Sequence, residues 1–293
     1  MAISMNSTCL ECYIKKNLKL ARTLGTEEQT MALAKALLKL YLDAPEGVPS
    51  PWMGPPVADL LHEIYGLPVD RYRQEKIDSN AFFLARQDLL REKADSAPDP
   101  VYAGLQLAIL GNYLDFSALQ DSLSFDTLED MLRKALEMEL DRAVYRDFCR
   151  ELEQGSSLLY LTDNAGEIGF DKLFAQQIRK RYPHLQITFC VRGQITQNDA
   201  TRADAEAVGL PFRVIDNGNR IAGTVIDLLS SEAKQALDTA DVILAKGMAN
   251  VETMYGCPYN IYYAFLVKCQ HFMNIFGKPL FTPMFVREPG RQK

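Results

Sequence analysis

Polar side chains follow apolar segments at three points in the sequence, and their chemical types suit a metal ion and a phosphate group. Asp163 and Asn164 come directly after the apolar segment SLLYLT, residues 157–162. Asp199 lies shortly after a second apolar segment, and Lys246 ends a third. Carboxylate and carboxamide oxygens are ligands that suit Mg²⁺ and Mn²⁺, and a lysine ammonium group binds phosphate. These residue types predict a site for a metal-bound phosphate group, provided that the fold brings the three segments together.

Each of these residues also has a purely structural interpretation. Asp and Asn are common helix N-caps, so Asp163 and Asn164 could cap a helix that starts near Glu167. In the same way, Asp199 could cap the segment ATRADAEAVG, and Lys246 alone could be a solvated loop lysine. The placement of all of them after apolar segments favours the functional interpretation, because a plain core excludes such polar clusters.

The second half of the sequence alternates short apolar segments with helical ones. The apolar segments are SLLYLT, QITFCVR, PFRVI, DVILA and LFTPMFV. This alternation predicts a mainly parallel sheet covered by helices on both faces, which is a doubly wound, three-layer α/β fold. Ligands of such sheets bind beyond the carboxyl ends of the strands, where helix N-termini also point. The fold class therefore predicts that Asp163, Asn164, Asp199 and Lys246 meet at one edge of the sheet.

The first half of the sequence has the spacing of apolar residues that is typical of helices. In the segment EEQTMALAKALLKLYLDA, apolar residues recur three and four positions apart. The Pro-rich segment EGVPSPWMGPP separates it from the next helical segment. We expect an all-helical part over residues 1–150, which could form two sub-bundles, packed on a Rossmann-like α/β domain over residues 151–293 that carries the metal site.

Composition excludes several classes of protein. The 293 residues are 47% hydrophobic and 24% charged, as in soluble globular proteins, and the net charge is −6. Without a long Lys/Arg cluster, this charge argues against a nucleic-acid partner or an anionic membrane surface. No apolar run approaches the length of a membrane span, and the N-terminus lacks the pattern of a secretory signal. We therefore expect a cytoplasmic protein, whereas the oligomeric state cannot be predicted from these features.

The cysteines suggest a second site of a different kind. Cys9 and Cys12 form a C-x-x-C motif near the N-terminus, and Cys269 is a distant candidate for a third ligand. A structural zinc ion needs four ligands, usually from two such pairs, so the motif by itself is incomplete. The alternative is a pair of ordinary thiols on a packed helix. Six Cys in a chain of this length do not indicate a disulfide framework.

Several motifs, taken together and in order, resemble those of a known family. They are CLEC near the N-terminus, GNYLDF at 111–116, TDNAGEIGFD at 162–171, NDATRADA at 198–205, KGMANVET at 246–253 and LVKCQHFMNIFG near the C-terminus. The sequence resembles the metal-dependent damage-control phosphatases, long catalogued as domain of unknown function 89. Its paired cysteines and compact length are similar to those of the microbial branch of that family.

The resemblance implies a helical N-terminal part on a Rossmann-like part and one divalent cation, Mn²⁺, Mg²⁺, Co²⁺ or Ni²⁺, held by Asp163, Asn164 and Asp199. It further implies hydrolysis of small phosphate esters, such as sugar phosphates or damaged phosphorylated metabolites. Asn112 and Asp115, from the helical part, are expected to close over the same site.

The implied roles extend to further residues of the matching motifs. A metal-activated water attack would leave its proton to a free carboxylate, and a lysine and backbone N–H groups would share the phosphate charge. The candidates for catalysis are Asp163, Asp199, Asp115 and Glu167. The candidates for substrate binding are Lys246, Asn112, Gly166, Asn250 and Thr201.

Two other functions are compatible with a Rossmann-like sheet. The first is an S-adenosylmethionine-dependent methyltransferase, but the expected Gly-rich loop is replaced by LTDNAGEIG, with an acid and an amide where the cofactor would approach. The second is a non-catalytic metal-binding protein. The cluster at the strand ends argues against it, because it would leave polar side chains around an open site.

Overall fold

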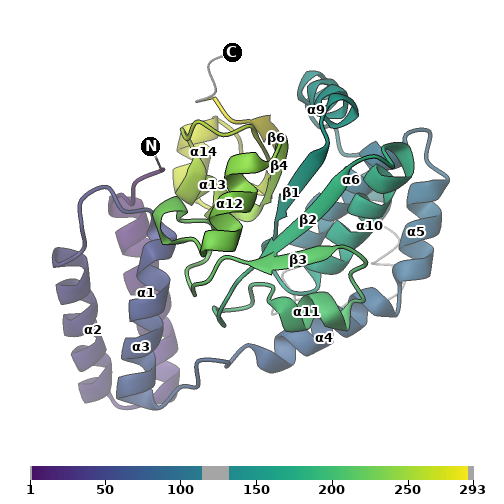
Figure 1. The fold of residues 1–293 in the computed structure, drawn as a ribbon. Coiled ribbons are helices and arrows are strands. Elements are labelled where there is room, and N and C mark those ends of the chain that lie inside the picture. The colour runs from purple at the N-terminus through teal and green to yellow at the C-terminus, as the bar shows by residue number, and fades with distance from the viewer. Residues whose placement is uncertain (1, 114–131, 290–293) are drawn as a thin grey trace.

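The computed structural model describes residues 2–113 and 132–289 of the chain. Its centre is a six-stranded sheet with the order β3-β2-β1-β4-β5-β6 (Figure 1). The strands are β1 (Ser157–Leu161), β2 (Gln186–Val191), β3 (Arg213–Asp216), β4 (Val242–Lys246), β5 (Ile261–Leu266) and β6 (Pro283–Arg287). β1 to β5 are parallel and β6 is antiparallel to β5, so the predicted mainly parallel α/β fold is confirmed.

Strand β5 was not among the segments predicted from the sequence. All six of its residues, IYYAFL, are buried. A strand that is covered on both faces loses the alternation of apolar and polar residues, so its sequence does not distinguish it from a buried helical segment.

Helices cover both faces of the sheet and complete the three layers (Figure 1). One face packs against α6 (Pro100–Tyr113), α9 (Arg142–Gln154) and α10 (Glu167–Arg181). The other packs against α12 (Ser231–Thr239), α13 (Gly247–Met254) and α14 (Gln270–Phe276). Along β1 the side chains alternate, with Tyr160 in the first core and Leu159 and Leu161 in the second. Tyr160 stacks on Phe189 of β2 with ring centroids 4.4 Å apart.

The first helices form a bundle with a small core of its own. This bundle consists of α1 (Ser7–Leu24), α2 (Glu27–Leu42) and α3 (Gly54–Tyr65) and lies at one side of the sheet (Figure 1). The helices α4 (Arg73–Leu84), α5 (Gln87–Asp95) and α11 (Arg202–Ala207) share another core with α10. Two 3₁₀ helices, η1 (Ser50–Met53) and η2 (Ile226–Leu228), lie in the connections.

The division into two parts at residue 150 remains a prediction. Helix α6 precedes that residue in the sequence, yet it packs in the core of the sheet. Two glycines on one face of α6 allow this close packing. A Cβ atom on Gly104 would lie 3.0 Å from a ring carbon of Phe174, and one on Gly111 would lie 3.1 Å from a ring carbon of Phe170. Both phenylalanines belong to α10. The close approach brings Asn112, the residue after Gly111, to the N-terminal end of α10.

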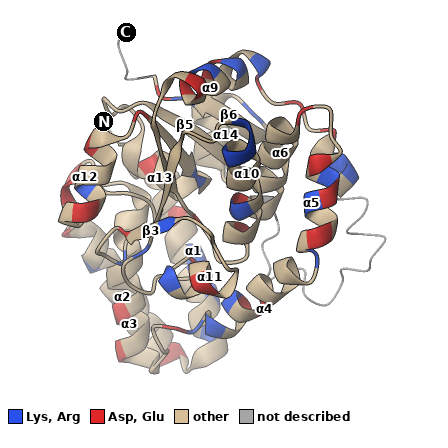
Figure 2. Cartoon of the chain, turned by 45° about the vertical axis from the view of Figure 1, so that its right-hand side comes forward, with Lys and Arg blue, Asp and Glu red and all other residues tan. Residues whose placement is uncertain are grey.

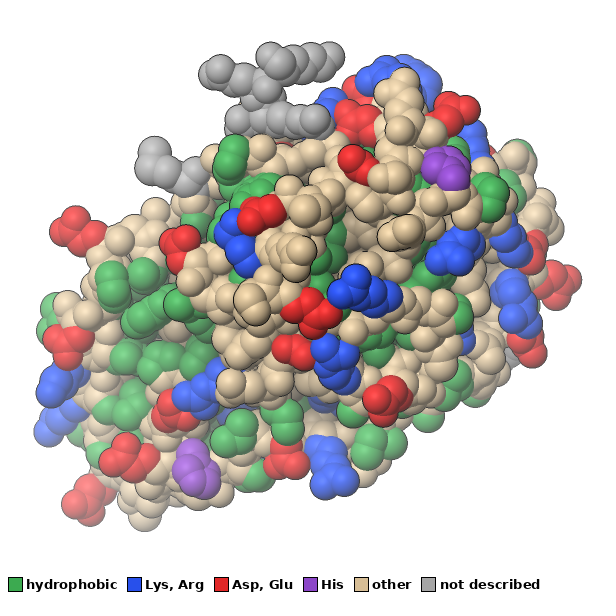
Figure 3. All heavy atoms as spheres, in the orientation of Figure 1, with side chains coloured by type: hydrophobic (Ala, Val, Ile, Leu, Met, Phe, Trp, Pro, Cys, Tyr) green, Lys and Arg blue, Asp and Glu red, His purple; other side chains and the backbone are tan. Residues whose placement is uncertain are grey.

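Charged residues lie mainly on the outer helices and loops, whereas the strands carry few of them (Figure 2). On the face shown in Figure 3, acidic and basic side chains are interspersed. Within the described residues, no helix is long and apolar enough to cross a membrane.

Candidate active site

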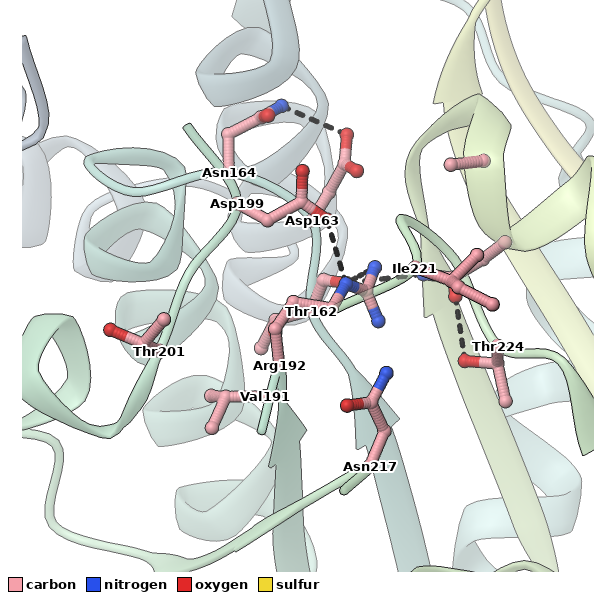
Figure 4. A network of polar contacts seen from close by, with 12 residues as sticks. Thr162, Asp163, Asn164, Val191, Arg192, Asp199, Thr201, Asn217, Ile221 and Thr224 are labelled. Carbon is pink, nitrogen blue, oxygen red and sulfur yellow. Dashed lines mark hydrogen bonds and ion pairs between the residues drawn. The ribbon is translucent and has the colours of Figure 1, made fainter. Parts of the chain in front are cut away.

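Backbone hydrogen bonds join the loops that follow β1 and β2. The amide of Ala165 donates to the carbonyl of Asn198, 2.8 Å away, and the amide of Ala200 donates to the carbonyl of Asp163, also 2.8 Å away. A β-bridge pairs Asn164 with Asp199. The side chains of Asp163, Asn164 and Asp199 consequently lie side by side (Figure 4). The residues predicted to hold a cation are therefore neighbours at the carboxyl end of the sheet.

These side chains do not cap the following helices. The N-cap of α10 is Gly166, which has a φ of 75° and makes no side-chain capping bond. The N-cap of α11 is Thr201, whose amide and hydroxyl both donate to Asp204. The structural interpretation of Asp163, Asn164 and Asp199 as caps is therefore not what the structure shows. Thr201 stands apart from the cluster, at the start of α11 (Figure 4).

Two amide side chains tie the cluster to Glu167. Nδ2 of Asn112 donates to Oδ2 of Asp163 at 2.8 Å and to Oε2 of Glu167 at 2.9 Å. Nδ2 of Asn164 donates to the same two oxygens at 2.9 and 3.1 Å. Oδ1 of Asn112 is buried without a hydrogen-bond partner among the described residues. Such an orphaned acceptor calls for a donor or a cation that the described residues do not supply.

A buried arginine that was not predicted as a site residue orients Asp199. Arg192 is 1% exposed, and its Nε donates to Oδ2 of Asp199 at 2.7 Å. Its Nη2 donates to the carbonyl of Thr162 at 3.1 Å, next to Asp163. The contact leaves Oδ1 of Asp199 without a hydrogen bond from the described residues. The only signal in the sequence was an arginine at the end of the apolar segment QITFCVR.

Lys246 is fully buried and is not among the residues that line the cavity described below. Its Nζ donates to Oε1 of Glu167 at 2.6 Å, to Oδ1 of Asp171 at 2.7 Å and to the carbonyl of Ala108 at 2.8 Å. These three bonds use all of its donors. The side chain predicted to bind phosphate is thus occupied by carboxylates, and its proposed contact with substrate stays without support from this geometry.

Asn250 and Gly166, two other predicted substrate contacts, are also engaged within the protein. Nδ2 of Asn250 donates to the carbonyls of Thr162 and Lys246, and its side chain is fully buried. The amide of Gly166 donates to Oδ1 of Asn80 at 2.8 Å. Both residues therefore stabilise the backbone around the site through hydrogen bonds within the protein. Asp115, predicted to close over the site, lies outside the described residues.

Burial and neighbouring charges shift the pKa values of these acids in different directions. Burial, with Glu167 and Asp199 nearby, raises the pKa of Asp163 to about 8. Burial also raises the pKa of Asp199, although Arg192 opposes the shift. Burial is the largest single effect on Glu167 and acts in the same sense, but the charge and hydrogen bond of Lys246, together with the hydrogen bond from Asn112 and the charge of Lys268, lower the pKa of that carboxyl group. Glu167 is therefore held ionised, whereas Asp163 and Asp199 lack sufficient positive charge.

The buried charges of this cluster do not balance. When all are ionised, its carboxylates outnumber its cations by two; the members are Asp163, Glu167, Asp171, Asp199, Arg192 and Lys246. Uncompensated buried charge is strongly unfavourable. One divalent cation among the oxygens of Asp163, Asn164 and Asp199 would restore neutrality, so the residues present fit such an ion.

A cavity of about 360 Å³ opens onto this cluster. Asp163, Asn164, Asp199 and Asn112 line it, and Lys268 lines it as well. Lys268 was not predicted as a site residue, although it lies in the motif LVKCQHFMNIFG. Its charge lowers the pKa of Asp163, against the larger opposing effect of burial.

Gly247 allows the turn from β4 into α13 to pass beside Asp163. Its φ is 76°, which L side chains rarely adopt, and a Cβ atom there would lie 2.0 Å from Oδ2 of Asp163. Only glycine fits between this turn and the carboxylate.

The cysteine site stays a prediction, although Cys9, Cys12 and Cys269 lie close together: burial and, to a smaller extent, the neighbouring thiols raise the pKa values of Cys9 and Cys269. Cys9 is buried, Cys12 is exposed and Cys269 is partly buried, and all three are free thiols. In residues 2–113 and 132–289, no group of three or more His, Cys, Asp or Glu side chains is arranged to hold a metal ion. The set of Asp163, Asn164 and Asp199 is not such a group, because it has two carboxylates and one amide. The zinc hypothesis for the cysteines therefore gains no support.

Known proteins resemble this chain over most of its length. It is 28% identical over 281 residues to an uncharacterized protein of Methanocaldococcus jannaschii, covering 92% of this chain and 90% of that protein. It is 33% identical over 199 residues to a protein of Archaeoglobus fulgidus named damage-control phosphatase, covering 66% of this chain and 67% of that protein.

A solved structure and a family description agree with these relatives. The crystal structure of a domain of unknown function 89 protein from Pyrococcus horikoshii superposes with a TM-score of 0.84 at 25% identity, covering 97% of this chain and 99% of that one. Residues 5–281 match the family described as damage-control phosphatase ARMT1-like domain. The match spans nearly the whole chain and includes every motif on which the resemblance rests. The chain belongs to the damage-control phosphatase ARMT1-like domain family.

Proposed function

We propose that this member of a phosphatase family hydrolyses small phosphate monoesters with the help of one divalent cation. The observation that carries the proposal is the convergence of Asp163, Asn164 and Asp199 on the wall of a 360 Å³ cavity. A cavity of this volume suits a small metabolite. The buried surplus of negative charge beneath it supports the cation.

The residues that would hold the cation are Asp163, Asn164 and Asp199, in agreement with the expectation from the sequence. When bound, a divalent cation supplies positive charge that neutralises phosphoryl oxygens and polarises the phosphorus centre. Arg192 keeps one oxygen of Asp199 fixed, and Asn112 and Asn164 keep one oxygen of Asp163 fixed. Each carboxyl group thus has one oriented oxygen and one that remains available.

We assign phosphate binding to the ammonium group of Lys268 and not to that of Lys246. Lys268 lines the cavity and is exposed, whereas Lys246 is 0% exposed and bonded to Glu167 and Asp171. Lys246 then has a positioning role: it keeps Glu167 ionised, and Glu167 accepts hydrogen bonds from Asn112 and Asn164. Phosphoryl transfer depends mainly on such positioning and on charge neutralisation.

The test is release of p-nitrophenol from p-nitrophenyl phosphate in the presence and absence of Mn²⁺. Asp163→Asn keeps the shape of the side chain and its ability to accept hydrogen bonds, but it removes one charge from the cation site. We expect turnover with Mn²⁺ to fall by at least about a hundredfold, the scale of removing one preorganised electrostatic element.

Asp227→Asn is the matched control, because Asp227 is exposed on η2 and does not line the cavity. Its activity should equal that of the wild type. Full Mn²⁺-dependent turnover in folded Asp163→Asn would refute the assignment. The family and the A. fulgidus relative are named as phosphatases, so the methyltransferase and non-catalytic alternatives receive no support from the comparisons.

A further inference from the structure

A second chamber adjoins the cavity of the proposed active site. It has a volume of about 210 Å³, beside the 360 Å³ of the first chamber. The two share three lining residues, Tyr13, Lys16 and Gln197, so they are neighbouring compartments of one hollow. The walls of the second chamber come from α1, from the start of α3, from the segment before α4 and from the loop after β2.

The two chambers differ in charge. The first is lined by four carboxyl groups, those of Glu75, Asp163, Asp199 and Glu252, which outnumber the ammonium groups of Lys268 and of the shared Lys16. The second is lined by Lys16, Arg71 and Arg220 and by no Asp or Glu among the described residues. The hollow thus has one end that attracts a cation and another end that attracts an anion.

Two of the three basic groups in the second chamber, Lys16 and Arg71, are available to a ligand. Arg220 forms a bidentate ion pair with Asp59, which lies outside the lining. Lys16 is exposed, and no ion pair or hydrogen bond involves its side chain in the described part of the chain. Within residues 2–113 and 132–289, Arg71 makes only a 3.5 Å contact with the hydroxyl of Tyr72 and lies over the ring of that residue. A planar guanidinium beside a free ammonium group is suited to a carboxylate or a phosphate.

Gln197 stands at the junction of the chambers in an unfavourable backbone conformation. Its φ is 45°, which non-glycine residues adopt rarely. The turn is fixed by the amide of Asp199, which donates to the carbonyl of Thr196 at 3.0 Å. Nε2 of Gln197 reaches toward the start of α3, 3.8 Å from the point where a Cβ on Gly54 would stand. Strain of this kind persists where the surrounding structure requires it, and here it places an amide between the two ends of the hollow.

We propose that the second chamber binds a second anionic group of the substrate, so that the preferred esters carry a carboxylate or another phosphate on the alcohol part. This inference rests on the proposed function, since it assigns the phosphoryl group to the first chamber. Lys16 and Arg71 hold the second anionic group of the substrate, and Gln197 contacts the part of the substrate that lies between this group and the phosphoryl group.

The test uses phosphonates, which cannot be hydrolysed, on the Mn²⁺-loaded protein. A series of phosphonocarboxylates with two to six carbon atoms is compared with the alkylphosphonates of equal length by isothermal titration calorimetry. At the best length, the carboxylate-bearing compound should bind at least about tenfold more tightly, the scale of one charge-assisted hydrogen bond. Equal affinities at every length would overturn the proposal.

The location is tested with the double variant Lys16→Gln, Arg71→Gln. The preference for the carboxylate should fall to about twofold or less, because both free cations of the chamber are removed. The matched control is Lys15→Gln, Arg73→Gln, which removes the adjacent exposed cations that do not line the chamber and should keep the preference. A preference that persists in the first variant, or that disappears in the second, would overturn the assignment to this chamber.

Turnover separates this inference from the proposed function. With Mn²⁺, 3-phosphoglycerate should have a larger kcat/KM than glycerol 3-phosphate, which has a hydroxymethyl group in place of the carboxylate. If neither ester nor p-nitrophenyl phosphate is hydrolysed, the proposed function fails, while the phosphonate affinities still decide whether the second chamber binds an anion. If both esters are hydrolysed equally and the phosphonates bind equally, the phosphatase assignment stands and the second chamber does not select an anion.

Discussion

Glu252 lines the candidate active-site cavity and differs from the other acids there in its surroundings. Burial raises its pKa to about 7, and no positive charge from the described residues opposes this effect. Glu167, by contrast, is held ionised by Lys246. Two glutamates near one cavity therefore have opposite protonation tendencies because only one of them has a buried cation as a partner.

The raised pKa of Glu252 makes stability depend on pH. Because the folded state keeps the proton at pH values where the unfolded chain has lost it, protonation contributes stability below a pH of about 4.5, and this contribution is lost as the pH rises through about 7. Glu252→Gln should avoid the loss. We expect the free energy of unfolding of the variant, relative to wild type, to increase by about 2 kcal/mol between pH 5 and pH 8.

Urea denaturation of both proteins in EDTA at these two pH values measures the effect. The control is Glu46→Gln, a substitution of an exposed residue in a turn, which should show no pH-dependent difference from wild type. A constant difference between Glu252→Gln and wild type across this range would show that Glu252 is ionised in the folded protein.

At the level of elements, the contact between α6 and α10 determines how α6 positions Asn112 at the site. Gly104 and Gly111 lie seven residues apart on the face of α6 that meets α10. In an exposed helix, replacing glycine with alanine stabilises by about 1 kcal/mol. Here the added methyl groups would press on Phe174 and Phe170, so overpacking of about 1–3 kcal/mol opposes that gain.

We expect Gly111→Ala to impair activity more than Gly104→Ala does. A Cβ on Gly111 would lie 3.2 Å from Cγ of Glu167, and the next residue, Asn112, bonds both Glu167 and Asp163. Gly104 lies two helical turns farther from the site and serves as the matched control. Thermal unfolding and kcat/KM with Mn²⁺ should show similar losses of stability for the two variants, with a loss of activity of at least about tenfold only for Gly111→Ala. Equal activities would mean that the position of Asn112 tolerates a displacement of α6.

At the level of the whole molecule, the proposed cation would join two β–α units. Asp163 follows β1 and Asp199 follows β2, and the backbone bonds between their loops are few. An ion that binds only the folded arrangement stabilises it by mass action, by about 2.7 kcal/mol at a hundredfold excess over Kd. Binding should also relieve the surplus of buried negative charge.

We therefore expect the melting temperature to rise by about 5 °C or more when excess Mn²⁺ is added to EDTA-treated protein. Differential scanning calorimetry of wild type and Asp163→Asn, with and without Mn²⁺, tests this expectation. The variant should be stabilised much less, because it lacks one charged ligand. An equal rise in both proteins would locate the stabilising ion elsewhere.

The sequence by itself determined the fold class and the place of the candidate site. The alternation of apolar and helical segments from residue 157 onward predicted a mainly parallel sheet, because strand and helix periods are local properties of the chain. The general rule for ligand sites in such sheets then placed Asp163, Asn164 and Asp199 at one edge. Strand β5 was missed because burial on both faces removes its alternation.

Only the tertiary structure decided what the charged residues do. From the sequence, phosphate binding was predicted for Lys246 and not for Lys268. The fold, however, buries Lys246 between Glu167 and Asp171 and leaves Lys268 on the cavity wall. Arg192 became part of the site for the same reason. Ion pairs and burial depend on residues that are far apart in sequence and are joined only when the sheet and its helices pack, so no local pattern encodes them.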